Sequence, residues 1–224
     1  MSELVSLVHS TPNAEHLITD MARVSAPNNQ GNYDTAPRLL CYLIKHKHWS
    51  PFEMASMCVE INTTRDIAAQ LCRHRSFSFQ EFSQRYANVK DLGSIVVPEF
   101  RRQDIKNRQN SVDDLSAELV SAFTRRTRML YAESQELYDD MIAAGVAKES
   151  ARKVLPMNSP SRLYMNGTLR SWIHYIDLRE GAGTQKEHRD IALAARSIFT
   201  TQFPVIAEAL ESLRQEVTEK PVIT

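Results

Sequence analysis

Residues 54–74 read MASMCVEINTTRDIAAQLCRH, and the pattern changes from strand to helix within this stretch. Apolar and polar side chains alternate from Met54 to Asn62, which is typical of a half-buried β-strand. Thr63 with Asp66 then predicts a helix N-terminus, followed by a helix over residues 64–74. The stretch therefore predicts a strand that leads directly into a short helix.

The rest of the chain adds mostly helices to this pair. Apolar spacing predicts helices over residues 14–22, 36–47, 148–155 and 168–179, and a last helix after Pro204. Capping signals predict two more, the longest from Ser111 with Asp114 to Gly145, and another from Thr184 with Glu187. Short strands are expected at residues 4–8, 94–97 and 162–166, and a solvated, mobile loop at 101–110. We expect one α+β domain over residues 1–224, mainly helical, with a small, mostly antiparallel sheet.

Composition narrows the possible functions. The 27 Lys and Arg residues balance 27 Asp and Glu residues in a chain of 224, whereas nucleic-acid-binding proteins usually carry a basic excess. No G-x-G-x-x-G or Walker-type loop occurs, so phosphate binding would depend on side chains. Cys41, Cys58 and Cys72 fit neither a zinc pattern nor a disulfide framework, and no signal peptide or membrane span is recognisable. We expect a cytoplasmic protein that binds neither a membrane nor nucleic acid.

Residues 73–86 concentrate the charge, and they read RHRSFSFQEFSQRY. Three arginines, a histidine and a glutamate lie among four aromatic residues. The guanidinium fork suits an anionic group, above all a phosphate. Two alternatives remain open from the residues alone: a salt-bridged turn between a helix and a strand, or RNA binding by the Arg-rich region 73–108.

Neither a protein nucleophile nor a metal site is indicated. Cys72 is expected to face the core, although Arg73 and His74 beside it could lower its thiol pKa. Ser83 has no evident base and is expected to hydrogen-bond an anion. Three histidines and one glutamate could be considered as metal ligands: His46, His48, Glu53 and His74. Their spacing is not that of a standard zinc site, so we expect no metal. An enzyme of this kind would polarise its substrate electrostatically and leave the difficult chemistry to a cofactor.

Several motifs together resemble one known family. Arg73-His74-Arg75, seven residues and then Ser83 match the R-H-R-x7-S signature of the flavin-dependent thymidylate synthases, and the match continues through residues 84–86. Four further segments are similar to the same family in the same order: Ala22-Arg23-Val24-Ser25, His48-Trp49-Ser50-Pro51-Phe52-Glu53, Arg152-x-Val154-Leu155-Pro156 and Asp177-Leu178-Arg179. The resemblance extends from about residue 20 to about residue 190.

This resemblance implies a specific reaction. Members of the family convert dUMP to dTMP with 5,10-methylenetetrahydrofolate as the carbon donor. FAD, reduced by NADPH, supplies the hydride, and no protein nucleophile is needed. The resemblance also implies a homotetramer whose active sites combine residues from several subunits.

The resemblance assigns site residues position by position. The residues expected to contact dUMP are Gln70, Leu71, Cys72, Arg73, Glu81, Phe82, Ser83, Gln84, Arg85, Arg152 and Arg179. The residues expected to contact FAD are Ser25, His48, Ser50, Glu53, Arg73, His74, Arg75, Glu81, Thr168, Leu169, Arg170 and His174. Arg179 corresponds to the catalytic residue that ionises or polarises the uracil ring near N3 and C4.

This sequence departs from the pattern at three positions. Thr168 and His174 replace asparagines found in some relatives, and Gln84 replaces a glycine. A threonine or histidine keeps part of the hydrogen-bonding capacity of asparagine. For Asp177 we instead expect an exposed polar helix face, held with Arg170 and His174 by pairs three and four residues apart.

Overall fold

A four-stranded antiparallel sheet organises the molecule, for which a computed structural model describes residues 3–218. Its strands are β1 (Val5–Ser10), β2 (Ser56–Thr64), β3 (Phe77–Glu81) and β6 (Pro160–Thr168), in the order β1-β2-β6-β3. The two nine-residue strands β2 and β6 pair over their whole length, from Ser56↔Thr168 to Thr64↔Pro160. The predicted α+β class with a small antiparallel sheet is confirmed.

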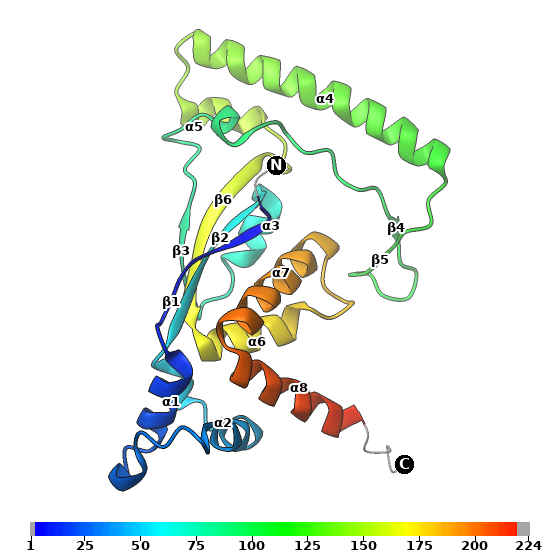
Figure 1. Ribbon diagram of the computed structural model, residues 1–224. Helices are drawn as coiled ribbons and strands as arrows, with labels where there is room; N and C mark the ends of the chain where they lie inside the picture. Colours follow the sequence, from blue (N-terminus) through cyan, green and yellow to red (C-terminus); the bar gives the residue numbers. More distant parts are fainter. Residues whose placement is uncertain (1–2, 219–224) are drawn as a thin grey trace.

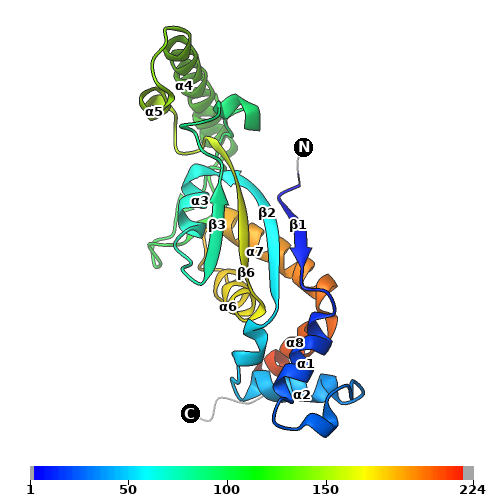
Figure 2. The ribbon, with the colours of Figure 1, turned by 90° about the vertical axis from the view of Figure 1, so that its left-hand side faces the viewer.

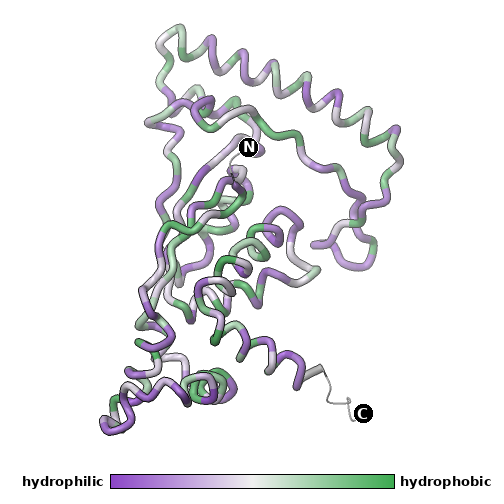
Figure 3. The backbone as a smooth tube through the Cα atoms, viewed as in Figure 1, coloured by the Kyte–Doolittle hydropathy of each residue, from purple (hydrophilic) through white to green (hydrophobic). Residues whose placement is uncertain are grey.

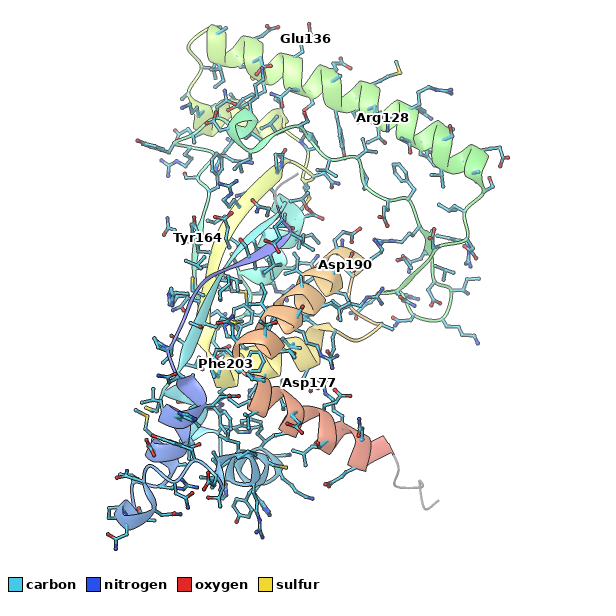
Figure 4. All side chains as sticks on the ribbon, viewed as in Figure 1. Arg128, Glu136, Tyr164, Asp177, Asp190 and Phe203 are labelled. Atoms are coloured by element: carbon cyan, nitrogen blue, oxygen red, sulfur yellow. The ribbon has the colours of Figure 1, made fainter. Side chains whose placement is uncertain are left out.

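Helices cover one face of this sheet, and the other face is open (Figures 1 and 2). On the covered face β2 buries Met57, Val59 and Ile61. On the open face Glu60 pairs in register with Tyr164, which projects away from the helices (Figure 4). This alternation is typical of an antiparallel sheet with one solvated face.

Six helices pack near the covered face or at the lower end of the sheet in Figure 1. They are α1 (Ala14–Ala22), α2 (Ala36–Lys45), α3 (Arg65–Leu71), α6 (Leu169–Arg179), α7 (Lys186–Gln202) and α8 (Pro204–Thr218). One apolar cluster unites them with the sheet. At its centre Trp172 is fully buried, and its indole nitrogen donates to the Met57 carbonyl over 2.8 Å. This core fixes α6 against β2.

Short 3-10 helices occupy four connections: η1 (Pro27–Asn29), η2 (Ser50–Glu53), η3 (Val89–Leu92) and η4 (Arg152–Val154). In the first connection Arg23 is buried, and its guanidinium donates to the carbonyls of Asn29 and Asn32 and, over 2.7 Å, to the Thr35 hydroxyl. Arg23, part of one motif that resembles the family, therefore holds the loop before α2 in place.

The longest helix, α4 (Ala117–Ala143), runs apart from the other long helices (Figure 1). Only Tyr138 on it is buried, and apolar residues alternate with polar ones along its length (Figure 3). Short contacts attach its C-terminal half to the body, including Ser134 Oγ to the Val154 carbonyl at 2.6 Å. The short helix α5 (Lys148–Ala151) follows it. No helix within residues 3–218 has the length and hydropathy required to cross a membrane.

Several predicted elements need correction. The segment 94–97 is not a strand, and the predicted mobile loop 101–110 instead lies within a hairpin of β4 (Arg102–Gln103) and β5 (Ser111–Val112). Ser111 therefore does not open the long helix, whose N-cap is Ser116. The N-cap of α7 is Gln185 rather than Thr184, and that of α3 is Thr64 rather than Thr63.

The strand β3 was not predicted, although Phe77-Ser78-Phe79-Gln80 alternates as a strand should. It pairs with β6 from Phe77↔Gly167 to Glu81↔Leu163. A Cβ at Gly167 would lie 2.5 Å from the Phe77 ring, so only glycine allows the ring to approach this closely. Gly167 thus helps to seat β3 on the sheet.

Candidate active site

The strand β3 divides the arginine-rich stretch 73–86 into two ends. Its five residues are paired with β6, and four steps of roughly 3.3 Å place Phe77 and Glu81 about 13 Å apart. Arg73, His74 and Arg75 precede the strand, and Ser83 and Arg85 follow it. The motif R-H-R-x7-S therefore spans a strand, and its two parts form separate groups. We call them the first end and the second end of β3.

At the first end, α6 and α3 bring Arg179 to His74, 105 residues away in sequence. The Arg179 Nε donates to the His74 Nε2 over 3.0 Å. Arg73, Arg75 and Arg179 have no carboxylate partner within residues 3–218. Three cations without acid partners leave positive charge available for an anionic ligand.

Buried polar groups lie behind these arginines. His188 on α7 is fully buried, and its Nδ1 lies 3.3 Å from the Gln70 Oε1. The Gln70 Nε2 donates to the Gln185 Oε1 over 2.7 Å. The His188 ring also lies at right angles to the His74 ring, with centroids 5.9 Å apart. Gln70, one of the predicted nucleotide contacts, is therefore held by two residues that were not predicted.

The two imidazoles at the first end are neutral near pH 7. Burial, then the Arg179 and Arg73 charges, lowers the pKa of His74. Burial, then Arg179 and His74, lowers the pKa of His188 to about 4. Burial also raises the pKa of Tyr175, whose ring lies 5.0 Å from that of His74. The arginines therefore carry the charge of this end, and the histidines provide neutral hydrogen-bonding groups.

The second end is more open. Ser83, Arg85 and Tyr86 line a cavity of about 350 Å³ together with residues 147–149. Arg85 forms an ion pair with Glu149 over 3.2 Å, and Lys148 donates to the Tyr86 carbonyl over 2.7 Å. The cavity therefore joins the end of β3 to α5.

Three other predicted nucleotide contacts are the last residue of β3, a residue three positions after it, and the residue that follows α5. Gln84 is buried, and its amide nitrogen has no hydrogen-bond partner within residues 3–218. Arg152 follows α5 and has no acidic partner in the same range. Glu81 is already engaged, because its Oε1 accepts from Arg65 and from the Ser161 hydroxyl, each over 2.9 Å.

A third group gathers predicted flavin contacts around α6 and η2. The Arg170 guanidinium forms an ion pair with Glu53, and the His174 ring packs edge-on against Trp49 with centroids 4.7 Å apart. Thr168 caps α6, because its hydroxyl accepts from the Ser171 backbone N–H over 3.2 Å. Trp49 and His174 also line a largely apolar cavity of about 970 Å³ bounded by α2, α6, α7 and α8.

Other predicted contacts are not joined to these groups by their side chains. Leu71 and Leu169 are fully buried in the core, which leaves only their backbone atoms for a ligand. Ser25, His48 and Ser50 are exposed, and Phe82 is half-buried.

Two expectations about individual side chains change. Cys72 is exposed rather than core-facing, and desolvation, with the Glu81 carboxylate nearby, raises the pKa of its thiol, which opposes thiolate formation. Asp177 is exposed as expected, but its partner is Arg214 on α8 at 3.4 Å rather than a residue of its own helix.

Some of the residues that build the site carry no recognisable signal in the sequence. His188 and Gln185 reach Gln70 across more than 100 residues, and Arg65 reaches Glu81 from the start of α3. Within residues 3–218 no group of three or more His, Cys, Asp or Glu side chains is arranged to hold a metal ion. The chemistry of the first end, with arginine side chains that have no acidic partner in the described residues, suits an anionic ligand.

Comparison with known proteins identifies the family. A family model described as "Thymidylate synthase complementing protein" matches residues 6–205. The probable flavin-dependent thymidylate synthase of Paramecium bursaria Chlorella virus 1 is 51% identical over 205 residues, which cover 92% of this chain and 94% of the viral protein. The flavin-dependent thymidylate synthase of Synechocystis sp. is 51% identical over 198 residues, covering 88% and 89%. The chain therefore belongs to the family of flavin-dependent thymidylate synthases.

A solved structure has the same fold. The UMP/dUMP methylase PolB from Streptomyces cacaoi, bound with 5-Br dUMP, superposes with a TM-score of 0.81 at 25% identity. The match covers 93% of this chain and 94% of PolB. The architecture built around β3 is therefore shared with a nucleotide-methylating enzyme.

Proposed function

We propose that this chain catalyses the reductive methylation of dUMP to dTMP without a protein nucleophile. FAD would be the cofactor, 5,10-methylenetetrahydrofolate the carbon donor and NADPH the reductant. The observation that carries the proposal is the first end of β3, where Arg73, Arg75 and Arg179 lack acidic partners in the described chain. Family membership supports the same reaction. We expect it to occur in the cytoplasm.

Arg179 is the residue proposed to activate the nucleotide. Its Nε is fixed by His74, which leaves the two terminal nitrogens of the guanidinium for a ligand. A fixed cation beside the uracil ring stabilises negative charge that develops there during attack. The lowered pKa of His74 keeps that ring neutral, so that it accepts the Arg179 hydrogen bond without adding a competing cation.

The third group and the arginines of the first end fit FAD. Arg73, Arg75 and Arg170 offer the donors that a pyrophosphate requires, and Trp49 with His174 offers aromatic surface for a flat ring. When bound, FAD would supply the hydride. Thr168 would contribute little beyond its backbone, because its hydroxyl caps α6.

The separation of the two ends supports a site shared between copies of this chain. A strand about 13 Å long separates the backbone of the two ends, which favours their contacting different parts of a ligand. We infer that Gln70, Arg73 and Arg179 of one copy meet Ser83, Arg85 and Arg152 of another, within a homotetramer. The exposed apolar residues of α4 offer a surface for this assembly: Leu119, Phe123, Met129, Leu130 and Leu137.

A direct assay tests the proposed reaction. Purified protein supplied with FAD, NADPH, methylenetetrahydrofolate and dUMP should be yellow and should form dTMP, and omission of dUMP or folate should abolish the product. A protein that takes up no FAD, or one that takes up FAD but forms no dTMP, would contradict the proposal.

Nothing in the comparisons favours the alternative of RNA binding by region 73–108. That alternative predicts binding to a generic RNA that weakens steeply with salt. Filter binding at two salt concentrations would detect it, and we expect no such binding.

A further inference from the structure

Several polar side chains lie behind Gln70, and the Glu187 carboxylate influences how the neighbouring amide groups are oriented. The Glu187 carboxylate accepts from the Arg101 guanidinium over 2.6 Å, and the Gln185 side chain lies close enough to help lower the Glu187 pKa. Burial raises the pKa of Glu187, but hydrogen bonds from its own backbone, from Gln185 and from Arg101 outweigh that effect, so its pKa is lowered. An ionised carboxylate can only accept hydrogen bonds. The negative charge of Glu187 therefore favours the orientation of Gln185 in which its oxygen faces Gln70 and its nitrogen does not.

This orientation propagates to Gln70. In this orientation Gln185 turns its oxygen toward the Gln70 amide nitrogen, at 2.7 Å. Gln70 then turns its own oxygen toward His188, so that the His188 Nδ1 is the donor in their 3.3 Å contact. The two contacts of Gln70, with Gln185 and with His188, thus favour the same orientation of its amide.

His188 is suited to this role by its surroundings. It is fully buried, and its Nε2 has no partner within residues 3–218, so its hydrogen-bonding contact there is with Gln70. Without His188, the Gln70 carbonyl would lose its donor and the amide could rotate. A rotated Gln70 amide would turn its carbonyl oxygen, an acceptor, toward the ligand. The ordered amide instead turns its remaining N–H, a donor, toward the same position.

We propose that His188 is a positioning residue that holds the Gln70 amide so that the bound nucleotide meets an N–H donor and not a carbonyl. The ligand group that this arrangement selects is a hydrogen-bond acceptor, an oxygen of the nucleotide. The inference rests on the proposed function, because it takes Gln70 as a contact of dUMP.

A double-mutant cycle between His188 and Gln70 tests this role. His188→Leu should raise the KM for dUMP about 10-fold while kcat stays within about twofold, as expected when ground-state and transition-state binding weaken equally. His188→Asn, which retains a donor near the Nδ1 position, should stay within about threefold of the wild-type KM. In a Gln70→Ala background, His188→Leu should change the KM no further, because the two residues would act as one unit.

Two further variants protect the test against a folding defect. Gln185→Leu removes the acceptor of the Gln70 amide, and because Gln185 is exposed, this change should not disturb the core. It should also raise the KM for dUMP several-fold. Ile191→Val perturbs core packing on the same helix without removing a hydrogen-bonding group, and its KM should equal that of the wild type. An unchanged KM in both His188→Leu and Gln185→Leu, or equal effects of His188→Leu with and without Gln70, would overturn the inference. Wild-type protein that neither binds dUMP nor forms dTMP would instead refute the proposed function.

Discussion

The two ends of β3 are built differently. At the first end, α3, α6 and α7 surround His74, Arg179 and His188 with buried partners, so one chain suffices to order these groups. At the second end, Ser83 and Arg85 are exposed beside α5, and Arg85 is balanced by Glu149. The first end is preorganised, whereas the second has little core behind it. The contrast is the basis of our proposal that another copy of the chain completes the second end and brings it to the charge of a first end.

The largest expected effect comes from removing one arginine from each end. Arg179→Ala should lower dTMP formation by roughly 100-fold or more, because a fixed charge at the reacting ring is lost. Arg152→Ala should be similarly inactive if it binds the nucleotide. Coexpression of the two inactive variants should restore up to about one quarter of wild-type activity, since some mixed sites would receive both intact arginines. The measurement is dTMP formed per subunit in mixed oligomers.

The same experiment distinguishes a shared site from a site within one chain. If both ends acted within the same copy, every site in the mixture would lack one arginine and no activity would return. Arg179→Ala expressed alone is the control for background activity. Arg108→Ala, a change at an exposed arginine without a side-chain contact in the described residues, should leave activity unchanged.

A smaller effect is expected from a substitution on the exposed face of α4, the surface proposed to bring the two ends together. Leu130→Asp places a charge on α4 where the side chain is 62% exposed in the single chain. It should shift the assembly toward smaller species in light scattering and lower activity about 10-fold, because burying an unpaired charge at an interface is unfavourable. Folding of the single chain should persist, since Leu130 lies outside the core.

A matched change should separate this effect from damage to the helix. Ala132→Asp lies on α4 about half a turn away from Leu130, on the side opposite Phe123. It should alter helix propensity comparably while leaving the assembly intact. Equal dissociation by both variants would argue against the face that contains Leu130 and Phe123.

The sequence predicted the helices and the longest strands better than the site. Residues 14–22 form the predicted helix with the same bounds, because a local apolar pattern determines it. The arginines of residues 73–86 were predicted as one anion-binding group, because the strand Phe77–Glu81 that separates them was not predicted. The residues behind Gln70 could not be predicted. The contact between Gln70 and His188 joins positions 118 residues apart, so it exists only after α3 and α7 pack together.

The smallest expected effect concerns the pH dependence of the first end. This end contains the buried His188 and the half-buried His74, whereas residues 81–86 and 147–152 of the second end contain no histidine. The folded pKa of His188, about 4, lies below its unfolded value of about 6.5. Protonation therefore favours the unfolded chain. The contribution of neutral His188 to the free energy of unfolding is fully present above about pH 6.5. It is lost as the pH falls toward 4, by at most about 3 kcal/mol. His74, whose pKa is also lowered, adds a loss of the same sign.

Urea unfolding at pH 7 and at pH 4.5 would measure this loss of unfolding free energy. His188→Asn has no group that titrates in this range, so its stability should fall less than that of the wild type between the two pH values. His9→Asn, a change at an exposed position on β1, should reproduce the wild-type difference. If His188→Asn lost as much stability as His9→Asn, acid would not act through the buried imidazole. The first end would then owe its order to the arginine contacts alone, and the contrast with the second end would be one of packing rather than of buried polar groups.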